Sequence, residues 1–307
     1  MRTVFVGGPG RSGTSFVTRS LGMHPDVCTL PDIELKIFTE KNGLMDLYHS
    51  IVVEYSPNRA HTALNQFKQF YTALINGGFG QRPLDSFLPK DRWEKCFNRF
   101  TDRLTQFDHP MPATEEYFFN AARILSSDLF SVILEHSDRN RSDPIFLEKT
   151  PHALLSSKFI RRIIPDSILI HVIRDPRSIA YSLRRMSWGP DDLETCCAWV
   201  ESYFTAWNRT KQFCEHNDSQ FTQIMIEELS NSEEVWNVII SDFLDFSKPT
   251  RLFANADLQK LNGWVETCKE DDITLMNLRL SNLAEALGYN RTDVGRVTSD
   301  VYEATFE

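Results

Sequence analysis

The chain alternates between short, strand-like apolar runs and longer stretches with helical periodicity. The apolar runs are Thr3–Val6, Ile145–Leu147, Ser167–Ile173 and Phe221–Ile226. Strands separated by helical patterns are typical of a parallel sheet whose strands are joined by crossover helices. We therefore predict an α/β fold in which the sheet is assembled from segments far apart in the sequence.

Three helices are predicted after the third apolar run. Proline is favoured at the first helical position, so one helix is expected to begin at Pro176. Apolar residues at spacings of three and four predict a long helix over Asp191–Cys214. A last helix is predicted over Asp272–Leu287, because Gly288 is a residue type common just beyond helix ends.

The stretch 38–143 differs from the rest because it is helical, rich in aromatic residues and interrupted by glycine and proline loop signals such as Asn76–Gly80. We predict a helical insertion, a lid or acceptor-binding region, within a single domain spanning residues 1–307. Its aromatic residues recur at helical spacing, which indicates a core and not a ligand site. They are Phe67, Phe70, Tyr71, Trp93, Phe97, Phe100, Tyr117, Phe118 and Phe119.

Charge and composition exclude several classes of function. The net charge of −9 gives no basic field for nucleic acid or an anionic membrane. Strand-like sequence begins by Thr3 and no apolar run is long enough to span a membrane, so we expect a cytoplasmic protein without a membrane span. The cysteines lack metal-type spacing and are expected to be free thiols. They are Cys28, Cys96, Cys196, Cys197, Cys214 and Cys268.

A glycine-rich loop, Gly7–Ser15, follows the first apolar run. It matches two glycines and the hydroxyl of the nucleotide-binding loop pattern, at Gly8, Gly13 and Ser15. Thr14 stands where that pattern has lysine, and Arg11 supplies a cation instead. Backbone amides and the positive end of the next helix can still bind a nucleotide-type anion. The loop predicts a P-loop-type parallel sheet flanked by helices, without metal-dependent ATP hydrolysis.

A second anion site is predicted where the third apolar run ends. Arg174 follows the strand at its carboxyl end, the edge at which open α/β sheets bind ligands. Ser178 and Ser182 lie four residues apart on one face of the following helix. An arginine and a serine can bind a second phosphate. The alternative is an Arg174–Asp175 pair with serines that cap the helix.

Together, the two segments resemble sulfotransferases that use 3′-phosphoadenosine-5′-phosphosulfate (PAPS). Phe5–Ser15 is similar to their 5′-phosphosulfate loop, in the arginine form of protein-tyrosine sulfotransferases, and His24–Val27 continues the likeness. Arg174 and Ser182 are similar to the 3′-phosphate pair and have the same separation of eight residues. Two further segments resemble the family, its lysine motif and its closing helix: Glu148–Pro151 and Leu280–Tyr289.

This resemblance implies in-line transfer of a sulfuryl group from PAPS to a hydroxyl acceptor, with 3′-phosphoadenosine-5′-phosphate (PAP) as product and no metal. Arg11 would contact the bridging and leaving oxygens, and Lys149 would assist at the sulfuryl group. Positioning and charge neutralisation are what such a transfer needs from a protein. The residues implied in binding the nucleotide are Gly10, Arg11, Ser12, Gly13, Thr14, Ser15, Arg174 and Ser182.

Two carboxylates compete for the role of base on the acceptor hydroxyl. Glu34 resembles the family's glutamate in the pattern Glu-x-x-x-Phe, which ends here at Phe38. Asp32 has the sequence distance from Arg11 that the base has in tyrosine sulfotransferases. We favour Glu34; the alternative for either residue is that it merely solvates a loop or pairs with Lys36. One departure is Ile226, where tyrosine sulfotransferases carry a tyrosine before the acidic pair.

Two other functions fit the same loop. A small-molecule kinase would require Mg²⁺ and prefer ATP, and the missing loop lysine argues against it. A nucleotide-binding protein without catalysis would not need Arg11, Lys149 and a nearby carboxylate. Sugars, lipids, peptide tyrosines and small alcohols all remain possible acceptors, and the sequence specifies no oligomeric state. The basic segment Lys248–Arg251 is a weaker candidate for contact with the 3′-phosphate.

Overall fold

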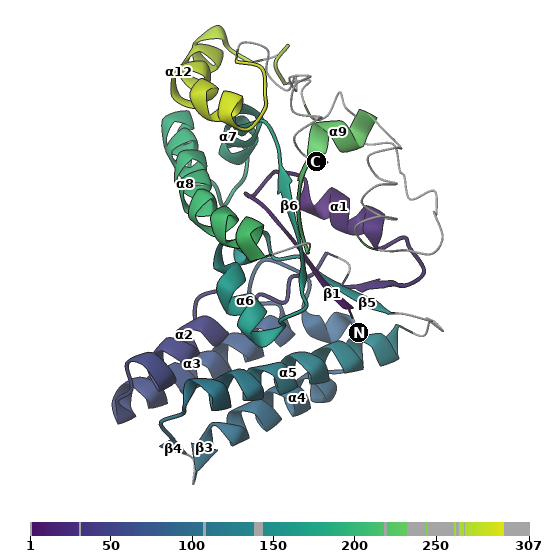
Figure 1. Ribbon diagram of the computed structural model, residues 1–307, viewed down its shortest axis with the longest axis vertical. Coiled ribbons are helices and arrows are strands. Elements are labelled where there is room, and N and C mark those ends of the chain that lie inside the picture. Colours follow the sequence, from purple (N-terminus) through teal and green to yellow (C-terminus); the bar gives the residue numbers. More distant parts are fainter. Residues whose placement is uncertain are drawn as a thin grey trace. The chain divides into compact units, whose positions relative to one another are not determined.

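The computed structural model describes residues 2–30, 32–106, 109–137, 144–217, 220–231, 244, 261, 264–266 and 268–291 (Figure 1). The fold is mixed α/β, with a five-stranded parallel sheet in the order β2-β5-β1-β6-β7 and flanking helices, as predicted. The chain forms two compact units, residues 1–6 with 21–169 and residues 7–20 with 170–307.

The strands of the sheet are β1 Arg2–Gly7, β2 Val27–Thr29, β5 Ile145–Glu148, β6 Ile168–Ile173 and β7 Phe221–Met225. In the first unit β5 lies between β1 and β2, so that Leu147 is the partner of both Val4 and Thr29. All four apolar runs are therefore confirmed as strands. β2 was not predicted because three residues are too few to show a period.

The first unit contains the helices between Leu44 and Ile163. They are α2 Leu44–Tyr48, the π-helix η1 His49–Val53, α3 Pro57–Asn76, the 3₁₀ turn η2 Leu84–Ser86, α4 Lys90–Arg103, α5 Glu115–His136, the 3₁₀ helix η3 Pro151–Ser156 and α6 Ser157–Ile163. A short hairpin, β3 Thr105–Gln106 with β4 His109–Pro110, follows α4. The helical character predicted for 38–143 is observed in α2 to α5. Polar caps stabilise these helices, since the Ser56 and Thr114 hydroxyls accept backbone bonds at the starts of α3 and α5.

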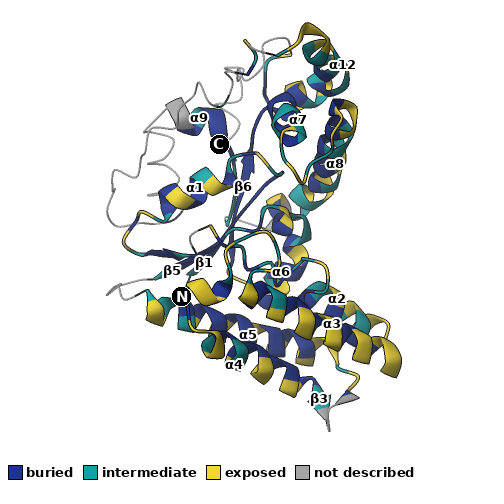
Figure 2. Cartoon of the chain, turned by 180° about the vertical axis from the view of Figure 1, so that it is seen from behind, coloured by how far each residue is buried: buried dark blue, intermediate teal, exposed yellow. Residues whose placement is uncertain are grey.

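Aromatic side chains form the core between α3, α4 and α5. Tyr71 and Phe97 stack with ring centroids 4.6 Å apart, and Phe67 meets both rings edge-on. Figure 2 shows each of these helices buried on one side and exposed on the other. The predicted aromatic core is confirmed except at Tyr117, which is 48 % exposed. Tyr117 lies in the first turn of α5, where its hydroxyl donates to the Arg103 carbonyl (2.7 Å) and its ring stays at the surface.

The second unit contains α1 Thr14–Leu21, α7 Pro176–Arg184, α8 Leu193–Asn217, the short α9 Ile226–Asn231 and α12 Glu270–Ala286. The helices α7, α8 and α12 pack against one another (Figure 1). Pro176 begins α7 as predicted, and Asp175 caps it by accepting from the Arg177 amide (2.9 Å). The α12 helix ends at Ala286, and Gly288 just beyond it has a left-handed conformation (φ 86°), as expected for glycine after a helix end.

Two further predictions concerned membrane spans and the state of the cysteines. Within the described ranges, no helix is both long enough and apolar enough to cross a membrane. All six cysteines are free thiols, as expected, and only Cys268 is not fully buried.

Candidate active site

The glycine-rich loop in the second unit is shaped by close approaches that exclude larger residues. A Cβ on Gly8 would lie 2.3 Å from the backbone oxygen of Val172 in β6 and 2.7 Å from the Ser12 hydroxyl. Gly13 has φ 104°, and a Cβ there would lie 2.8 Å from the side chain of Ile226. Both glycines are therefore required for the loop to fold back against the strand end.

The loop presents groups suited to an anion. Ser12 is fully buried, and its hydroxyl has no hydrogen-bond partner among the described residues. Thr14 is buried and begins α1, whereas Ser15 is exposed. A buried hydroxyl without a partner costs about 1–3 kcal/mol, which an oxygen acceptor from a ligand would relieve.

Arg11 lies at the exposed tip of the loop in a left-handed conformation (φ 73°). This conformation is uncommon for residues other than glycine. Its side chain reaches α7, where Nε donates to the Ser182 hydroxyl (3.0 Å). The preceding residue, Gly10, faces the ring of Trp188, to which a Cβ would approach within 3.1 Å.

Arg174 follows β6 directly and is 7 % exposed. One guanidinium nitrogen, Nη1, donates to the Arg11 carbonyl (3.2 Å) and the other, Nη2, to the Leu261 carbonyl. Its Nε has no hydrogen-bond partner in the described part of the chain. Burial lowers the pKa of Arg174, and the nearby Glu227 opposes that shift. Arg11, Arg174 and Ser182, predicted from separate motifs, thus lie together in one unit.

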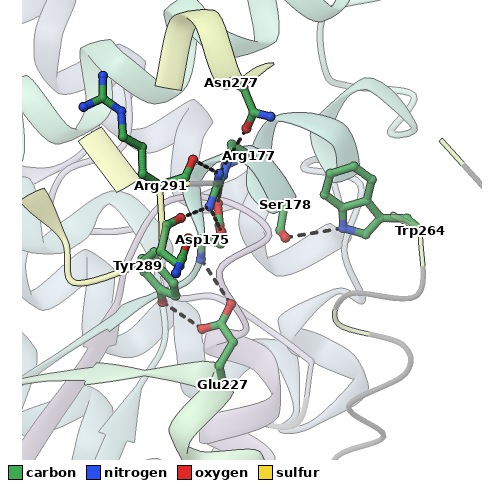
Figure 3. A network of polar contacts seen from close by, with 9 residues as sticks. Asp175, Arg177, Ser178, Glu227, Trp264, Asn277, Tyr289 and Arg291 are labelled. Carbon is green, nitrogen blue, oxygen red and sulfur yellow. Dashed lines mark hydrogen bonds and ion pairs between the residues drawn. The ribbon is translucent and has the colours of Figure 1, made fainter. Parts of the chain in front are cut away.

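The turn that carries Arg174 is fixed by a buried polar network (Figure 3). The Asp175 amide donates to Glu227 Oε1 (3.1 Å), and the Tyr289 hydroxyl donates to Glu227 Oε2 (2.7 Å). Burial raises the pKa of Glu227 to about 7, while bonds from Tyr289 and Asp175 act in the other direction. Burial and the Glu227 carboxylate raise the pKa of Tyr289. The carboxyl end of β6 is thereby connected to the chain beyond α12.

Arg177 lies three residues after Arg174, but all the N–H groups of its guanidinium donate hydrogen bonds within the protein. It forms a buried ion pair with Asp175 (2.7 Å). Its remaining N–H groups donate to the Asn277 side chain (3.0 Å) and to the carbonyls of Asn290 (2.7 Å) and Arg291 (2.8 Å). A guanidinium has five N–H donors, so this pattern uses them all. The alternative Arg174–Asp175 pair is replaced by Asp175–Arg177.

The two serines of α7 also differ, since one is buried in the fold and the other is partly exposed. Ser178 is fully buried and accepts a hydrogen bond from Trp264 Nε1 (3.3 Å; Figure 3). Ser182 is partly exposed and accepts a hydrogen bond from Arg11 Nε. Trp264 also stacks on Tyr181, with ring centroids 4.4 Å apart. Ser178 is therefore part of the fold, which leaves Ser182 as the serine at the surface of the candidate site.

The candidate base and the candidate lysine lie in the first unit. Lys149 Nζ is 2.7 Å from Glu34 Oε1, and Lys36 Nζ is 3.5 Å from Glu34 Oε2. The Glu34 and Lys149 side chains are only 20 % and 12 % exposed, so this ion pair is shielded from water. Asp32 is exposed and lies in a left-handed turn (φ 59°). The basic segment Lys248–Arg251 lies outside the described residues.

Sequence reasoning missed the residues that hold these groups in place. Glu227 and Tyr289 stood out only as parts of longer segments, and Arg177 was not singled out. The signal available was position, since each lies beside a predicted strand or helix end. Gln81, which bonds both backbone groups of Glu34, gave no sequence signal at all.

Comparison with known proteins agrees with this picture. A family model described as "Sulfotransferase family" matches residues 3–248. No curated protein sequence matches the chain significantly. Among solved structures, the sulfotransferase domain of the Synechococcus PCC 7002 olefin synthase is 14 % identical, with a TM-score of 0.50 and 94 % of both chains covered. At this identity the likeness concerns the fold.

Two other solved structures are less similar in shape and add no argument. The sulfotransferase domain from the curacin biosynthetic pathway is 12 % identical, covering 94 % of this chain and 98 % of its own, with a TM-score of 0.49. A sulfotransferase from Mycobacterium avium is 14 % identical, covering 96 % of this chain and 78 % of its own, with a TM-score of 0.45.

Proposed function

Because the chain belongs to the sulfotransferase family, we propose that it transfers the sulfuryl group of PAPS to a hydroxyl acceptor. The observation that supports this most directly is the grouping of Arg11, Arg174 and Ser182 beside one glycine-rich loop. Two arginines and a serine are suited to a nucleotide with negative charge at both its 5′ and 3′ positions.

In this proposal each part of the donor has its own set of residues. The amides and hydroxyls of Ser12–Ser15 bind the 5′-phosphate, and Arg11 binds the bridging and leaving oxygens. Arg174 and Ser182 bind the 3′-phosphate. The buried Ser12 hydroxyl and the Arg174 Nε, both without partners among the described residues, fit a ligand rich in oxygen acceptors.

The proposed chemistry is a single displacement at sulfur. The acceptor oxygen forms a bond to sulfur while the bond from sulfur to the phosphate oxygen breaks, and PAP leaves with that oxygen. Glu34 accepts the proton of the acceptor hydroxyl, and Lys149 and Arg11 neutralise charge on the sulfuryl and leaving oxygens. Such positioned charges contribute most where water is excluded, and Glu34 and Lys149 are already shielded from water.

Glu34 and Asp32 can be separated by isosteric variants. We expect Glu34→Gln to lower turnover of PAPS about 10²- to 10⁴-fold, the range for a general base, and Asp32→Asn to lower it far less. Turnover is measured as release of PAP from PAPS with water as the acceptor, so that no other acceptor need be known. The opposite ranking would assign the base to Asp32.

The test of donor identity is a calorimetric titration of the purified protein with PAP in the absence of metal, compared with Mg·ATP. Binding of PAP with little binding of Mg·ATP supports the proposal. Preference for Mg·ATP would instead indicate a small-molecule kinase. Binding of PAP without any turnover of PAPS would indicate a nucleotide-binding protein that lacks catalysis.

A further inference from the structure

The segment 34–36 has no helical or strand hydrogen bonds, yet side chains satisfy each of its backbone amides. Buried or half-buried amides nearly always need a partner, and here each partner comes from a distant part of the first unit. The Glu34 amide donates to Gln81 Oε1 (3.1 Å), the Leu35 amide to Glu148 Oε1 (3.3 Å) and the Lys36 amide to Thr150 Oγ1 (3.3 Å).

Gln81 bonds both backbone groups of Glu34. Its Oε1 accepts from the Glu34 amide, and its Nε2 donates to the Glu34 carbonyl (2.9 Å). This is the paired arrangement that an adjacent strand would make, supplied by one side chain. Gln81 belongs to the insertion, in the loop between α3 and η2. The insertion therefore holds the main chain of the candidate base.

Glu148 and Thr150 accept hydrogen bonds from the next two amides, those of Leu35 and Lys36. Glu148 is the last residue of β5 and is 2 % exposed. The Thr150 hydroxyl donates to Glu148 Oε1 (2.6 Å), so the two acceptors form one unit. Lys149, between them, pairs with the Glu34 carboxylate itself (2.7 Å). Three successive residues at the end of β5 thus bond three successive residues of the loop.

The backbone around the segment needs this support. Asp32 and Lys36 have φ angles of 59° and 57°, a region that residues other than glycine seldom occupy. Such conformations persist where surrounding contacts determine them, and they concentrate at functional sites. The contacts of Gln81, Glu148 and Thr150 fix the backbone that follows Asp32, up to and including the amide of Lys36.

We propose that Gln81, Glu148 and Thr150 are positioning residues, which hold segment 34–36 so that the Glu34 carboxylate stays against Lys149. The insertion then takes part in sulfuryl transfer through Gln81. This inference rests on the proposed function for its kinetic consequence, but the contacts themselves can be tested without it.

Two pairs of variants test the proposal. Thr150→Val removes the hydroxyl and keeps the shape, whereas Thr150→Ser keeps the hydroxyl. Gln81→Met removes both amide groups at similar length, whereas Gln81→Glu keeps an acceptor for the Glu34 amide. We expect Thr150→Val and Gln81→Met to lower kcat for release of PAP from PAPS by about tenfold or more, with KM for PAPS nearly unchanged. Thr150→Ser should restore most of the rate.

Amide hydrogen exchange supplies the readout that does not depend on activity. Exchange at Lys36 should accelerate in Thr150→Val but not in Thr150→Ser, and exchange at Glu34 should accelerate in Gln81→Met. Unchanged exchange would overturn the contacts. Faster exchange with unchanged kcat would overturn positioning and leave a purely structural role. If the wild-type protein neither binds PAP nor turns over PAPS, the proposed function fails, while the exchange data still decide the contacts.

Discussion

Arg11 donates a hydrogen bond from Nε to the Ser182 hydroxyl, at 3.0 Å, although 171 positions separate the two residues in the chain. The proposed function assigns Arg11 to the 5′ end of the donor and Ser182 to its 3′-phosphate. Both residues would therefore exchange this bond for bonds to ligand oxygens when the nucleotide binds. The bond orients the two side chains beforehand, which reduces the entropy lost on binding.

Replacing Arg11 should separate catalysis from binding. We expect Arg11→Ala to lower release of PAP from PAPS at least about 10²-fold, because charge on the leaving oxygens loses its donor. The affinity for PAP in a calorimetric titration should fall far less than turnover, because Ser12–Ser15, Arg174 and Ser182 still bind its phosphates. Arg11→Lys keeps the charge and should recover part of the rate. Wild-type turnover in Arg11→Ala would remove Arg11 from the catalytic set.

Replacing Arg174 should weaken binding of the nucleotide itself. We expect Arg174→Ala to cost about 1.5–3 kcal/mol, the range for hydrogen bonds to charged groups, which corresponds to roughly 10- to 150-fold in the Kd for PAP. Arg185→Ala is the matched control, because Arg185 is exposed at the end of the same helix, α7. Equal affinities of the two variants would exclude Arg174 from the site.

Gly8→Ala should disrupt the loop by steric conflict. The added Cβ would meet the Val172 carbonyl at 2.3 Å, and a backbone oxygen cannot rotate away as a flexible side chain can. We expect loss of PAP binding together with a lower melting temperature. Gly80→Ala is the control, since Gly80 also has a positive φ (64°) but a Cβ added there would meet no atom of the described residues within 4 Å. Similar losses in both variants would show that backbone strain, and not the close approach, governs the effect.

Stability should depend on pH through Glu227. Its pKa rises from 4.5 to about 7 on folding, chiefly because it is buried. Between these values the folded protein keeps a proton that the unfolded chain releases, so the free energy of unfolding falls as pH rises from about 4.5 to 7. The shift corresponds to about 3 kcal/mol. Burial also raises the pKa of Glu148 to about 7, so that carboxyl contributes in the same window.

Urea unfolding at about pH 5 and about pH 8 measures this dependence. Glu227→Gln keeps one acceptor oxygen for the Asp175 amide and cannot ionise, and its Nε2 can donate to the Tyr289 hydroxyl oxygen in place of the bond that Oε2 accepts. It should therefore lose less stability between the two pH values than the wild type. Glu285→Gln, at an exposed position of α12, is the control. A wild-type slope in Glu227→Gln would show that this carboxyl does not titrate in the window.

The sequence predicted those parts of the molecule whose signals are local. β5 and β6 are buried and mostly apolar, and α7 has its own start signal at Pro176, so each was found with bounds close to those observed. The loop residues and Arg174 could also be nominated, because glycine spacing and the end of a strand have direct physical meaning. Local signals sufficed for these elements and for nominating the candidate ligand-binding residues, but not for the three-residue strand β2.

The supporting contacts could not be predicted, because they depend on side chains brought together by folding. Arg174 and Arg177 flank the same dipeptide, and only the structure shows that the second has all its donors occupied. Gln81 is one glutamine in a loop of the insertion, 47 positions from Glu34. No periodicity or motif relates the two, so their pairing appears only when the chain is folded.

The network around Arg177 has a consequence for the order in which the protein can mature during synthesis. Three of its acceptors are supplied by Asn277, Asn290 and Arg291, and Tyr289 completes the contact with Glu227. A ribosome-bound chain that ends before these residues holds a buried guanidinium and a buried carboxyl with part of their partners missing. The first unit can begin to fold early, but the turn bearing Arg174 reaches its final form only after residue 291 has left the exit tunnel.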